Sequence, residues 1–344
     1  MNESLSNPKE MKKVITRGIR AALLALGSAT KAELSQKLGI SFPTTSKFLS
    51  QMEREGELIN VGLDDSSGGR RAKRYAYNPE YMLGLAIFLE KKETNYIIFN
   101  CLGEVKEQGN TSSVLMDDVL TLMKHVEEII VKYPRIGSIA IGVPGSVNNG
   151  RIIHIPSYEK FQDMDLKGYF EERFAIPVVV ENDMNAAVIG YKNNRATNND
   201  NPSLVYLYLG HNGPGAGIMI NGDVVRGSTF FSGEVAFIPM YDDRNFLQAL
   251  NNGSDRGRAG HLDREKIDAI SRLVALFAAT INPHAIIFCS DEVNQSITDQ
   301  IAIKSSTYIN QEHLPELTSS DWKQDYLHGL QNLGLDLMIS GNSK

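Results

Sequence analysis

Asn182 and Asp183 are the two residues whose types and position best suit chemistry. They directly follow the apolar run at residues 178–180, which predicts a buried strand, and open α/β sheets place their ligands at the carboxyl ends of such strands. A carboxylate in that position can act as the base that phosphoryl transfer to a hydroxyl group requires. Asp183 could equally cap the helix expected at residues 185–191. The two roles are compatible, and we predict that the pair contacts a ligand.

A glycine-rich segment occupies residues 210–217. Gly213, Gly215 and Gly217 could cradle a phosphate, because glycine lets the backbone approach an anion closely. They could instead form a tight turn between two strands. Without a second phosphate loop, the turn is the better-supported interpretation.

The composition is that of a globular protein. The chain has 344 residues, of which 42% are hydrophobic and 22% charged, and these values exclude a largely disordered or collagen-like chain. No apolar run approaches the roughly 20 residues that span a membrane, and the polar amino terminus lacks the pattern of a secretory signal. Cys101 and Cys289 lie far apart, without another Cys or His at metal-ligand spacing. We therefore expect a cytosolic protein without a membrane partner, a disulfide framework or a cysteine-rich zinc site.

The formal net charge of −6 conceals two segments of opposite sign. Residues 1–80 hold 13 Lys and Arg against 9 Asp and Glu, whereas residues 81–344 hold 22 against 32. A basic segment in front of an acidic body is compatible with a separate nucleic-acid-binding domain. Asn78-Pro79 marks the expected linker between the two segments.

The basic segment predicts a helix-turn-helix followed by a hairpin. Thr30 and Glu33 have the spacing of a capping box at the start of a short second helix, and Gly39 begins the turn after it. Ser41 can cap a third helix that has Pro43 in its first turn. The expected elements are helices at residues 9–26, 31–38 and 42–55, and strands at residues 58–61 and 71–77 on either side of a turn at residues 64–69.

This arrangement indicates a winged helix-turn-helix domain that binds double-stranded DNA. The start of a recognition helix enters the major groove, and here it carries hydroxyl and cationic side chains. The glycine-flanked tip of the hairpin carries cations that can reach phosphates or a minor groove. The unit could instead be a small packing or dimerisation module, but the combined signals favour DNA binding. The candidate DNA contacts are Thr44, Thr45, Ser46, Lys47, Arg70, Arg71 and Lys73.

The rest of the chain alternates between strands and helices, which predicts an α/β fold. We expect a DNA-binding domain at residues 1–80, a first α/β lobe at residues 81–200, and a second lobe with a dimerisation surface at residues 201–344. The expected strands lie at residues 83–89, 95–99, 136–141, 152–155, 178–180, 203–209, 215–220 and 285–289, and the expected helices at residues 116–133, 166–174, 185–191 and 264–281.

Five motifs occur in a set order along the chain. They are residues 67–72 with Tyr75 and Asn78-Pro79; residues 142–145 with Gly150; residues 177–187 around Glu181-Asn182-Asp183; residues 209–227; and Gly233-Glu234-Val235. Each motif alone is weak to moderate, but the ordered set resembles the ROK family of sugar-responsive repressors and sugar kinases, in the arrangement of its xylose and N-acetylglucosamine repressors. The resemblance implies a winged helix-turn-helix followed by an actin-like, ribonuclease-H-like ATPase fold with a ligand cleft between two lobes.

The resemblance also implies roles for residues of the cleft. In kinases of the family, the residue at the position of Asp183 takes the proton from the attacking sugar hydroxyl, and the one at Asn182 holds a neighbouring hydroxyl. Glu234 matches a sugar-contacting glutamate, although it could be an ordinary loop carboxylate. We therefore predict that Gly145, Asn182, Asp183 and Glu234 bind a small sugar effector.

The sequence departs from the enzymes of the family at functional positions. Ala236-Phe237 stands where the family has a Gly-His pair that contacts sugar and ligates zinc, and the family's cysteine-rich zinc loop is missing. Ala86 stands where an Asp would hold magnesium, and Phe88 where a glycine would let the backbone approach phosphate. Gly213, Gly215 and Gly217 are then the remnant of a nucleotide loop. We expect no metal site, no cofactor and no enzymatic activity.

These observations predict a transcriptional regulator, a repressor of carbohydrate utilisation genes, that binds operator DNA as a homodimer or a dimer of dimers. One alternative is a sugar kinase of the same family, of whose machinery the base and one loop are present. Another is an orphan regulator whose body dimerises without a sugar effector.

Overall fold

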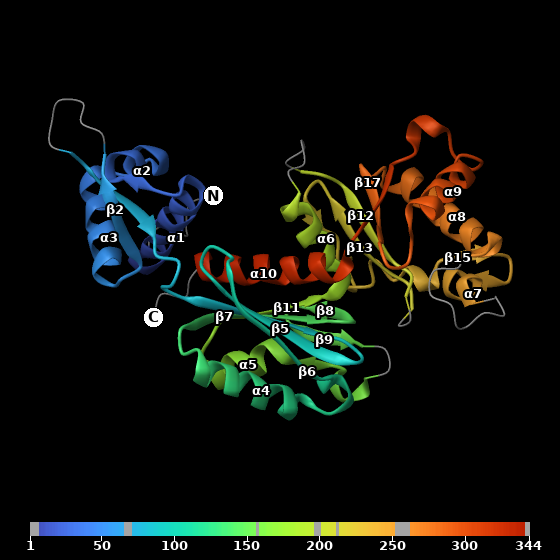
Figure 1. The fold of residues 1–344 in the computed structure, drawn as a ribbon, viewed down its shortest axis with the longest axis horizontal. Helices are drawn as coiled ribbons and strands as arrows, with labels where there is room; N and C mark the ends of the chain where they lie inside the picture. The colour runs from blue at the N-terminus through green and yellow to red at the C-terminus, as the bar shows by residue number, and fades with distance from the viewer. Residues whose placement is uncertain are drawn as a thin grey trace.

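The computed structural model of the chain describes residues 7–64, 71–155, 158–195, 201–210, 213–251 and 262–340. Figure 1 shows an N-terminal unit and two lobes, with the long helix α10 (Trp322–Ser340) running from the second lobe towards the N-terminal unit across the sheet of the first lobe. Among the described helices, none combines the length and the apolar character needed to cross a membrane. Arg70, a predicted DNA contact, lies outside the described residues.

The N-terminal unit packs three helices against a small antiparallel sheet with the strand order β1-β3-β2. Thr30 and Glu33 form the predicted capping box, because the Thr30 hydroxyl accepts from the Glu33 amide while the Glu33 carboxylate accepts from the Thr30 amide. The Ser41 side chain caps the third helix, also as predicted. The elements are α1 (Pro8–Leu26), β1 (Ala29–Thr30), α2 (Lys31–Leu38), α3 (Phe42–Arg54), β2 (Leu58–Leu63) and β3 (Lys73–Tyr77).

The first lobe is built on a five-stranded mixed sheet with the order β11-β7-β4-β5-β6. Its central strand β4 is buried along its whole length because both faces are covered: Leu85 and Ile87 pack in the cluster that includes α4 and α5, and Ala86 and Phe88 in the cluster that includes α10. The elements are β4 (Leu83–Leu89), β5 (Glu93–Asn100), β6 (Val105–Ser112), α4 (Val119–Lys132), β7 (Ile136–Val143), α5 (Leu166–Phe174), β11 (Val178–Asn182) and α6 (Asp183–Asn194).

The second lobe has a five-stranded sheet with the order β14-β13-β12-β17-β18. Val205 and Leu207 of β12 pack towards α8 and α9, whereas Tyr206 packs towards α6. The elements are β12 (Leu204–Tyr208), β13 (Gly215–Ile220), β14 (Asp223–Val224), α7 (Phe246–Asn251), α8 (Arg264–Thr280), β17 (Ala285–Cys289), α9 (Gln295–Ser305) and β18 (Glu316–Ser320). The mixed α/β class predicted from the sequence is confirmed.

Helices α6 and α10 cross in close contact between the lobes. A Cβ atom on Gly190 of α6 would lie 1.8 Å from the Asp325 carbonyl oxygen, and one on Gly329 of α10 would lie 1.8 Å from the Ala186 carbonyl oxygen. Only glycine at both positions permits this approach. Because α10 also packs on β4 and β7, this last helix of the segment predicted as the second lobe, residues 201–344, lies against the first lobe.

Two small sheets complete the lobes. The first lobe has the antiparallel sheet β10-β9-β8, and in the second lobe a two-stranded pair precedes α7. The elements are β8 (Ser146–Asn148), β9 (Arg151–His154), β10 (Met164–Asp165), β15 (Pro239–Tyr241) and β16 (Arg244–Asn245).

Candidate functional site

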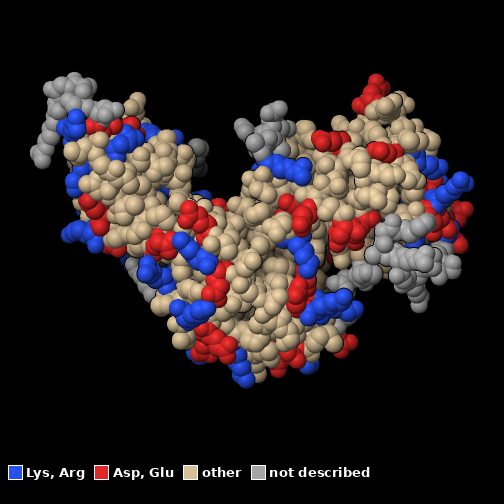
Figure 2. All heavy atoms as spheres, in the orientation of Figure 1, with Lys and Arg blue, Asp and Glu red and all other residues tan. Residues whose placement is uncertain are grey.

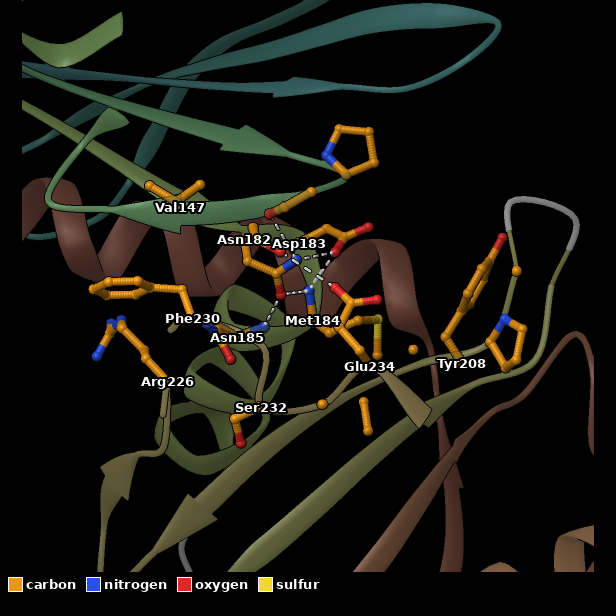
Figure 3. Close-up of a pocket in the computed structure, with 18 of the residues that line it drawn as sticks. Val147, Asn182, Asp183, Met184, Asn185, Tyr208, Arg226, Phe230, Ser232 and Glu234 are labelled. Atoms are coloured by element: carbon orange, nitrogen blue, oxygen red, sulfur yellow. Dashed lines mark hydrogen bonds between the residues drawn. The ribbon is translucent and has the colours of Figure 1, made fainter. Parts of the chain in front are cut away.

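A pocket between the two lobes brings together the predicted effector residues. Gly145, Asn182 and Asp183 line it from the first lobe, and Glu234 lines it from the second, together with Gly213 and Gly215 of the glycine-rich segment (Figure 3). These residues are far apart in the sequence and meet because β7 and β11 end, and β13 begins, at the same opening. Whether they bind a sugar stays a prediction.

Asn182 organises the first-lobe side of this pocket. Its side-chain oxygen accepts from the amides of Met184 and Asn185, so Asn182, and not Asp183, is the N-cap of α6. Its side-chain nitrogen donates to the Gly145 carbonyl at 3.1 Å and to Asp183 Oδ1 at 2.9 Å. The capping role considered for Asp183 thus falls to its neighbour, and the Asp183 carboxylate is held at the pocket by a positioned amide.

Asp183 is suited to exchange a proton near neutral pH. Desolvation raises the pKa of its carboxyl group to about 7, and the nearby negative charge of Glu234 acts in the same direction. Hydrogen bonds from the Met184 amide and the Asn182 side chain to Oδ1 oppose the rise. A carboxyl group with this pKa can accept a hydrogen bond from a ligand hydroxyl or donate one to it.

Two polar contacts between side chains join the two lobes at the pocket. Ser146 Oγ of β8 lies 3.3 Å from Glu234 Oε1, and it can donate to that carboxylate. Arg226, which follows β14, forms an ion pair with the buried carboxylate of Glu181 on β11. Glu181 also accepts a hydrogen bond from the Asn185 side chain, so this carboxylate has a polar partner from each lobe. Sequence analysis missed Ser146 and Arg226, although Arg226 lies within the motif at residues 209–227.

The three glycines of the nucleotide-loop remnant differ in their surroundings. Gly213 has a φ of 97° and donates to the Gly210 carbonyl, as in a tight turn. A Cβ atom on Gly217 would lie 2.0 Å from the Met184 carbonyl oxygen of α6, so this glycine is required for packing between β13 and α6. Gly217 does not line the pocket, whereas Gly213 and Gly215 do.

Comparison with known proteins shows what the body of the chain resembles. Residues 91–255 match the ROK family. The chain carries a ROK family domain. A xylose repressor from Bacillus spizizenii is 28% identical over 241 residues, which are 67% of this chain and 61% of that protein. A β-glucoside kinase from Listeria monocytogenes is 32% identical over 130 residues, which are 37% of this chain and 42% of the kinase.

The ROK likeness extends over the whole fold. The crystal structure of a ROK family transcriptional regulator, a homologue of the E. coli MLC protein, superimposes with a TM-score of 0.65 at 19% identity, and covers 96% of this chain and all of that chain. A likeness at this level of identity establishes the fold, here an actin-like ROK fold. The chain spans only about 55 to 63% of the length of the curated repressors that head the comparison.

Four aromatic rings pack in a row from the end of β4 to the edge of the pocket. Phe88 at the end of β4 packs on Tyr326, with ring centroids 5.3 Å apart, and Tyr326 packs on Trp322 at 5.6 Å. Trp322 packs in turn on Tyr208, at 5.2 Å, and Tyr208 lines the pocket. This aromatic stack of four residues connects β4, α10 and β12. Within the described residues, no group of three or more His, Cys, Asp or Glu side chains could hold a metal ion.

The predicted DNA contacts on α3 fall into two groups. Lys47 is exposed, and Thr44 and Ser46 are partly exposed. Thr45 is fully buried and donates to the Ser41 carbonyl at 3.1 Å, so its predicted role as a DNA contact is wrong for this conformation. Figure 2 shows Lys and Arg side chains along the outer edge of the N-terminal unit.

On the hairpin, Arg71 is exposed and Lys73 is 52% exposed, 3.4 Å from Glu53. Arg74, in contrast, forms ion pairs with Asp64 and Glu33 and so holds the hairpin against α2.

Proposed function

We propose that the protein is a DNA-binding transcriptional repressor of carbohydrate utilisation genes and not an enzyme. The observation that carries the proposal is the combination, in one chain, of a basic N-terminal unit with a ROK body that keeps its polar pocket but has an aromatic stack at the end of β4. A chain with this combination can bind DNA and a sugar, but it lacks the carboxylate that would hold magnesium for phosphoryl transfer.

In this proposal, residues 1–80 are a winged helix-turn-helix domain. The turn between α2 and α3 starts at Gly39, in the left-handed conformation, and α3 presents Lys47 with Thr44 and Ser46 at its exposed amino-terminal half. The hairpin β2-β3 is the wing, and Arg70, Arg71 and Lys73 at or near its tip supply cations for the phosphate backbone. A two-fold dimer would place two such domains on half-sites about 10 base pairs, or a multiple of that, apart.

The pocket is the proposed effector site. Asn182, Asp183 and Glu234 offer an amide and two carboxylates to sugar hydroxyls, and the Gly145 carbonyl is already held by the Asn182 amide. Several curated relatives are named xylose repressors, so a pentose is the first effector to test. Such a regulator would act in the cytosol, where its operator lies.

Helix α10 is the proposed link between effector and DNA. At its start, Trp322 stacks on the pocket residue Tyr208. At its end, the carbonyls of Met338 and Ile339 accept hydrogen bonds from Arg20 of α1, at 3.4 and 3.3 Å. A sugar that binds more tightly to one arrangement of the lobes would shift α10 and thereby the N-terminal unit, and differential affinity of this kind is what allosteric coupling requires.

A sugar kinase is the second candidate, which the Asp183 pKa of about 7 and the similarity to β-glucoside kinase favour. It would need a metal-holding carboxylate and a phosphate loop at the end of β4, where the chain has Ala86 and Phe88. An assay of ATP consumption with a panel of hexoses and pentoses separates the candidates: turnover at about 1 per second or faster, as kinases show, contradicts the repressor proposal.

Selection of bound fragments from genomic DNA, followed by titration of the recovered site, tests the repressor proposal. We expect affinity for that site roughly 10³-fold or more above that for random DNA, and weaker binding when xylose or another cognate sugar is added. Binding without preference for any fragment would contradict the proposal. Specific binding that no sugar alters would identify an orphan regulator.

A further inference from the structure

Three phenylalanines lie within four residues of Glu234, the carboxylate that the second lobe contributes to the pocket. Phe230 lines the pocket itself, on the side of Val147 and Arg226 (Figure 3). Phe231 and Phe237 lie on either side of Glu234 in the sequence, and their rings pack on each other with centroids 5.4 Å apart. The three rings form what we call the phenylalanine rim: Phe230, Phe231 and Phe237.

The backbone fixes this rim to Glu234. The Glu234 amide donates to the Phe231 carbonyl at 3.3 Å, and the Phe237 amide donates to the Glu234 carbonyl at 3.2 Å. The chain segment that positions the carboxylate therefore also positions both rings. Because Glu234 is in contact with Ser146 of the opposite lobe, the rim lies beside the point where the two lobes meet.

The exposed rings and the backbone conformation of the rim both disfavour folding, which makes the rim a candidate for function. Phe231 is 54% exposed and Phe237 is 61% exposed, so the paired rings remain in water instead of contributing to the core. Phe230 has a φ of 60°, a conformation that bulky residues with a Cβ atom rarely adopt. Strained backbone and exposed aromatic pairs are both features that gather at binding sites.

The polarity of the two regions indicates the ligand. Asn182, Asp183 and Glu234 line the pocket and suit the hydroxyl groups of one sugar ring. Phe231 and Phe237 lie outside the pocket lining, offer no hydrogen-bonding side chain and suit the apolar face of a second ring. We propose that the effector is a glycoside: its sugar ring occupies the polar pocket, and a second ring, aromatic or the C–H face of another pyranose, packs on Phe231 and Phe237. This inference rests on the proposed effector function of the pocket.

Isothermal titration of the full chain with matched glycosides tests the inference. The probes are the methyl and phenyl glycosides of xylose and glucose, as both anomers, together with xylobiose and cellobiose. For at least one sugar, we expect the phenyl glycoside or the disaccharide to bind about tenfold more tightly than the methyl glycoside, a difference of about 1.4 kcal/mol. If the phenyl glycoside gains affinity, the second ring is aromatic. If the disaccharide gains affinity, the second ring is another sugar.

The double variant Phe231→Ser/Phe237→Ser should lose this tenfold preference and bind the methyl glycoside within about twofold of the unaltered chain. Phe42→Ser is the matched control, because Phe42 is 53% exposed on α3, in the N-terminal unit; it should leave the preference unchanged. Circular dichroism of each variant verifies folding.

The outcomes separate the inference from the function on which it rests. Equal binding of methyl and phenyl glycosides and disaccharides overturns the inference but leaves the sugar effector in place. Binding of none of these probes overturns both. Retention of the preference by the double variant also overturns the inference, and a change in mass by light scattering without a change in preference would instead assign the rim to self-association.

Discussion

Arg20 and Glu57 form an ion pair at the junction between the N-terminal unit and the body. The guanidinium group of Arg20 on α1 donates to the Glu57 carboxylate, which is 2% exposed. The same guanidinium group reaches the carbonyls of Met338 and Ile339 in the last turn of α10. Carbonyls at the end of a helix have no partner within the helix, and a cation there is favourable. One side chain thus joins α1, the segment before β2 and α10.

Arg20→Met should uncouple the body from the N-terminal unit. The substitution leaves the buried Glu57 carboxylate without its cationic partner, and we expect the free energy of unfolding to fall by about 3 kcal/mol. We also expect the sugar-induced change in DNA affinity to shrink, because α10 loses its contact with α1. Denaturant titration and DNA binding with and without sugar measure the two effects. Lys13→Met, which removes an exposed pair with Glu10 on the same helix, should change neither; an unaltered sugar response in Arg20→Met would contradict the proposed link.

DNA binding should depend on the cations of α3 and the wing. Lys47→Ala, Arg70→Ala and Arg71→Ala should each weaken operator binding and reduce the slope of log affinity against log salt by about 1, because each removes about one phosphate contact. Lys124→Ala, on the exposed surface of α4 in the first lobe, should leave affinity and slope unchanged. Fluorescence anisotropy over a salt series measures both. If all three variants keep the original slope, the proposed placement of the DNA surface is wrong.

Local signals predicted the core elements well. β4, β13, β17 and α5 have the predicted bounds, because buried strands and capped helices carry their pattern within a few residues. The strand β6 was missed, since it is an edge strand with exposed and partly exposed side chains and no apolar alternation. Helix α10 was missed because it packs against α6 as well as against β4 and β7, so no single apolar stripe marks it. Thr45 was misassigned because sequence position alone does not show which side of α3 faces the core.

The candidate site was predicted in part. The family resemblance selected Asn182, Asp183 and Glu234, which the structure places around one pocket. The contacts between lobes, such as Arg226 with Glu181, join residues 45 positions apart, and neither residue has a local pattern that predicts its partner. The aromatic stack could not be predicted for the same reason. Trp322 contacts Tyr208 only because α10 folds back against the first lobe.

Asp183→Asn should stabilise the fold in a pH-dependent way. The folded-state pKa of Asp183, about 7, lies above the value near 4 expected in the unfolded chain. Between these pH values the unfolded chain has released the proton and the folded chain has not, so stability falls as pH rises from about 4 to about 7 and is then constant. The variant lacks this loss and should be more stable by about 4 kcal/mol at pH 8, since each of the roughly three pKa units is worth about 1.4 kcal/mol, with little difference at pH 4.

The control for this variant is Glu292→Gln. Desolvation raises the pKa of Glu292 to about 7 as well, but this residue does not line the pocket. It should show the same pH dependence of stability while sugar binding stays unchanged, whereas Asp183→Asn should lose sugar binding. Thermal unfolding over a pH series measures the stability difference, and a stabilisation of Asp183→Asn that is equal at pH 4 and pH 8 would contradict the assigned pKa.

The fluorescence emission of Trp322 should change when a sugar binds but not when ATP is added. It is the only tryptophan of the chain, and its ring packs 5.2 Å from that of Tyr208, which lines the pocket. A sugar that contacts the pocket should change the Trp322 emission in a saturable way, and Asp183→Asn should remove that change. ATP with magnesium should leave the emission and the melting temperature unaltered, because the end of β4 has Ala86 and Phe88 in place of a metal-holding carboxylate and a phosphate-loop glycine, and Phe88 packs on Tyr326. A ligand at 100 times its dissociation constant would add about 2.7 kcal/mol to the free energy of unfolding. Bound ATP would therefore raise the melting temperature measurably. N-acetyltryptophanamide titrated in parallel corrects for light absorbed by ATP, and a saturable ATP response beyond that correction would mean that the aromatic stack opens to admit a nucleotide.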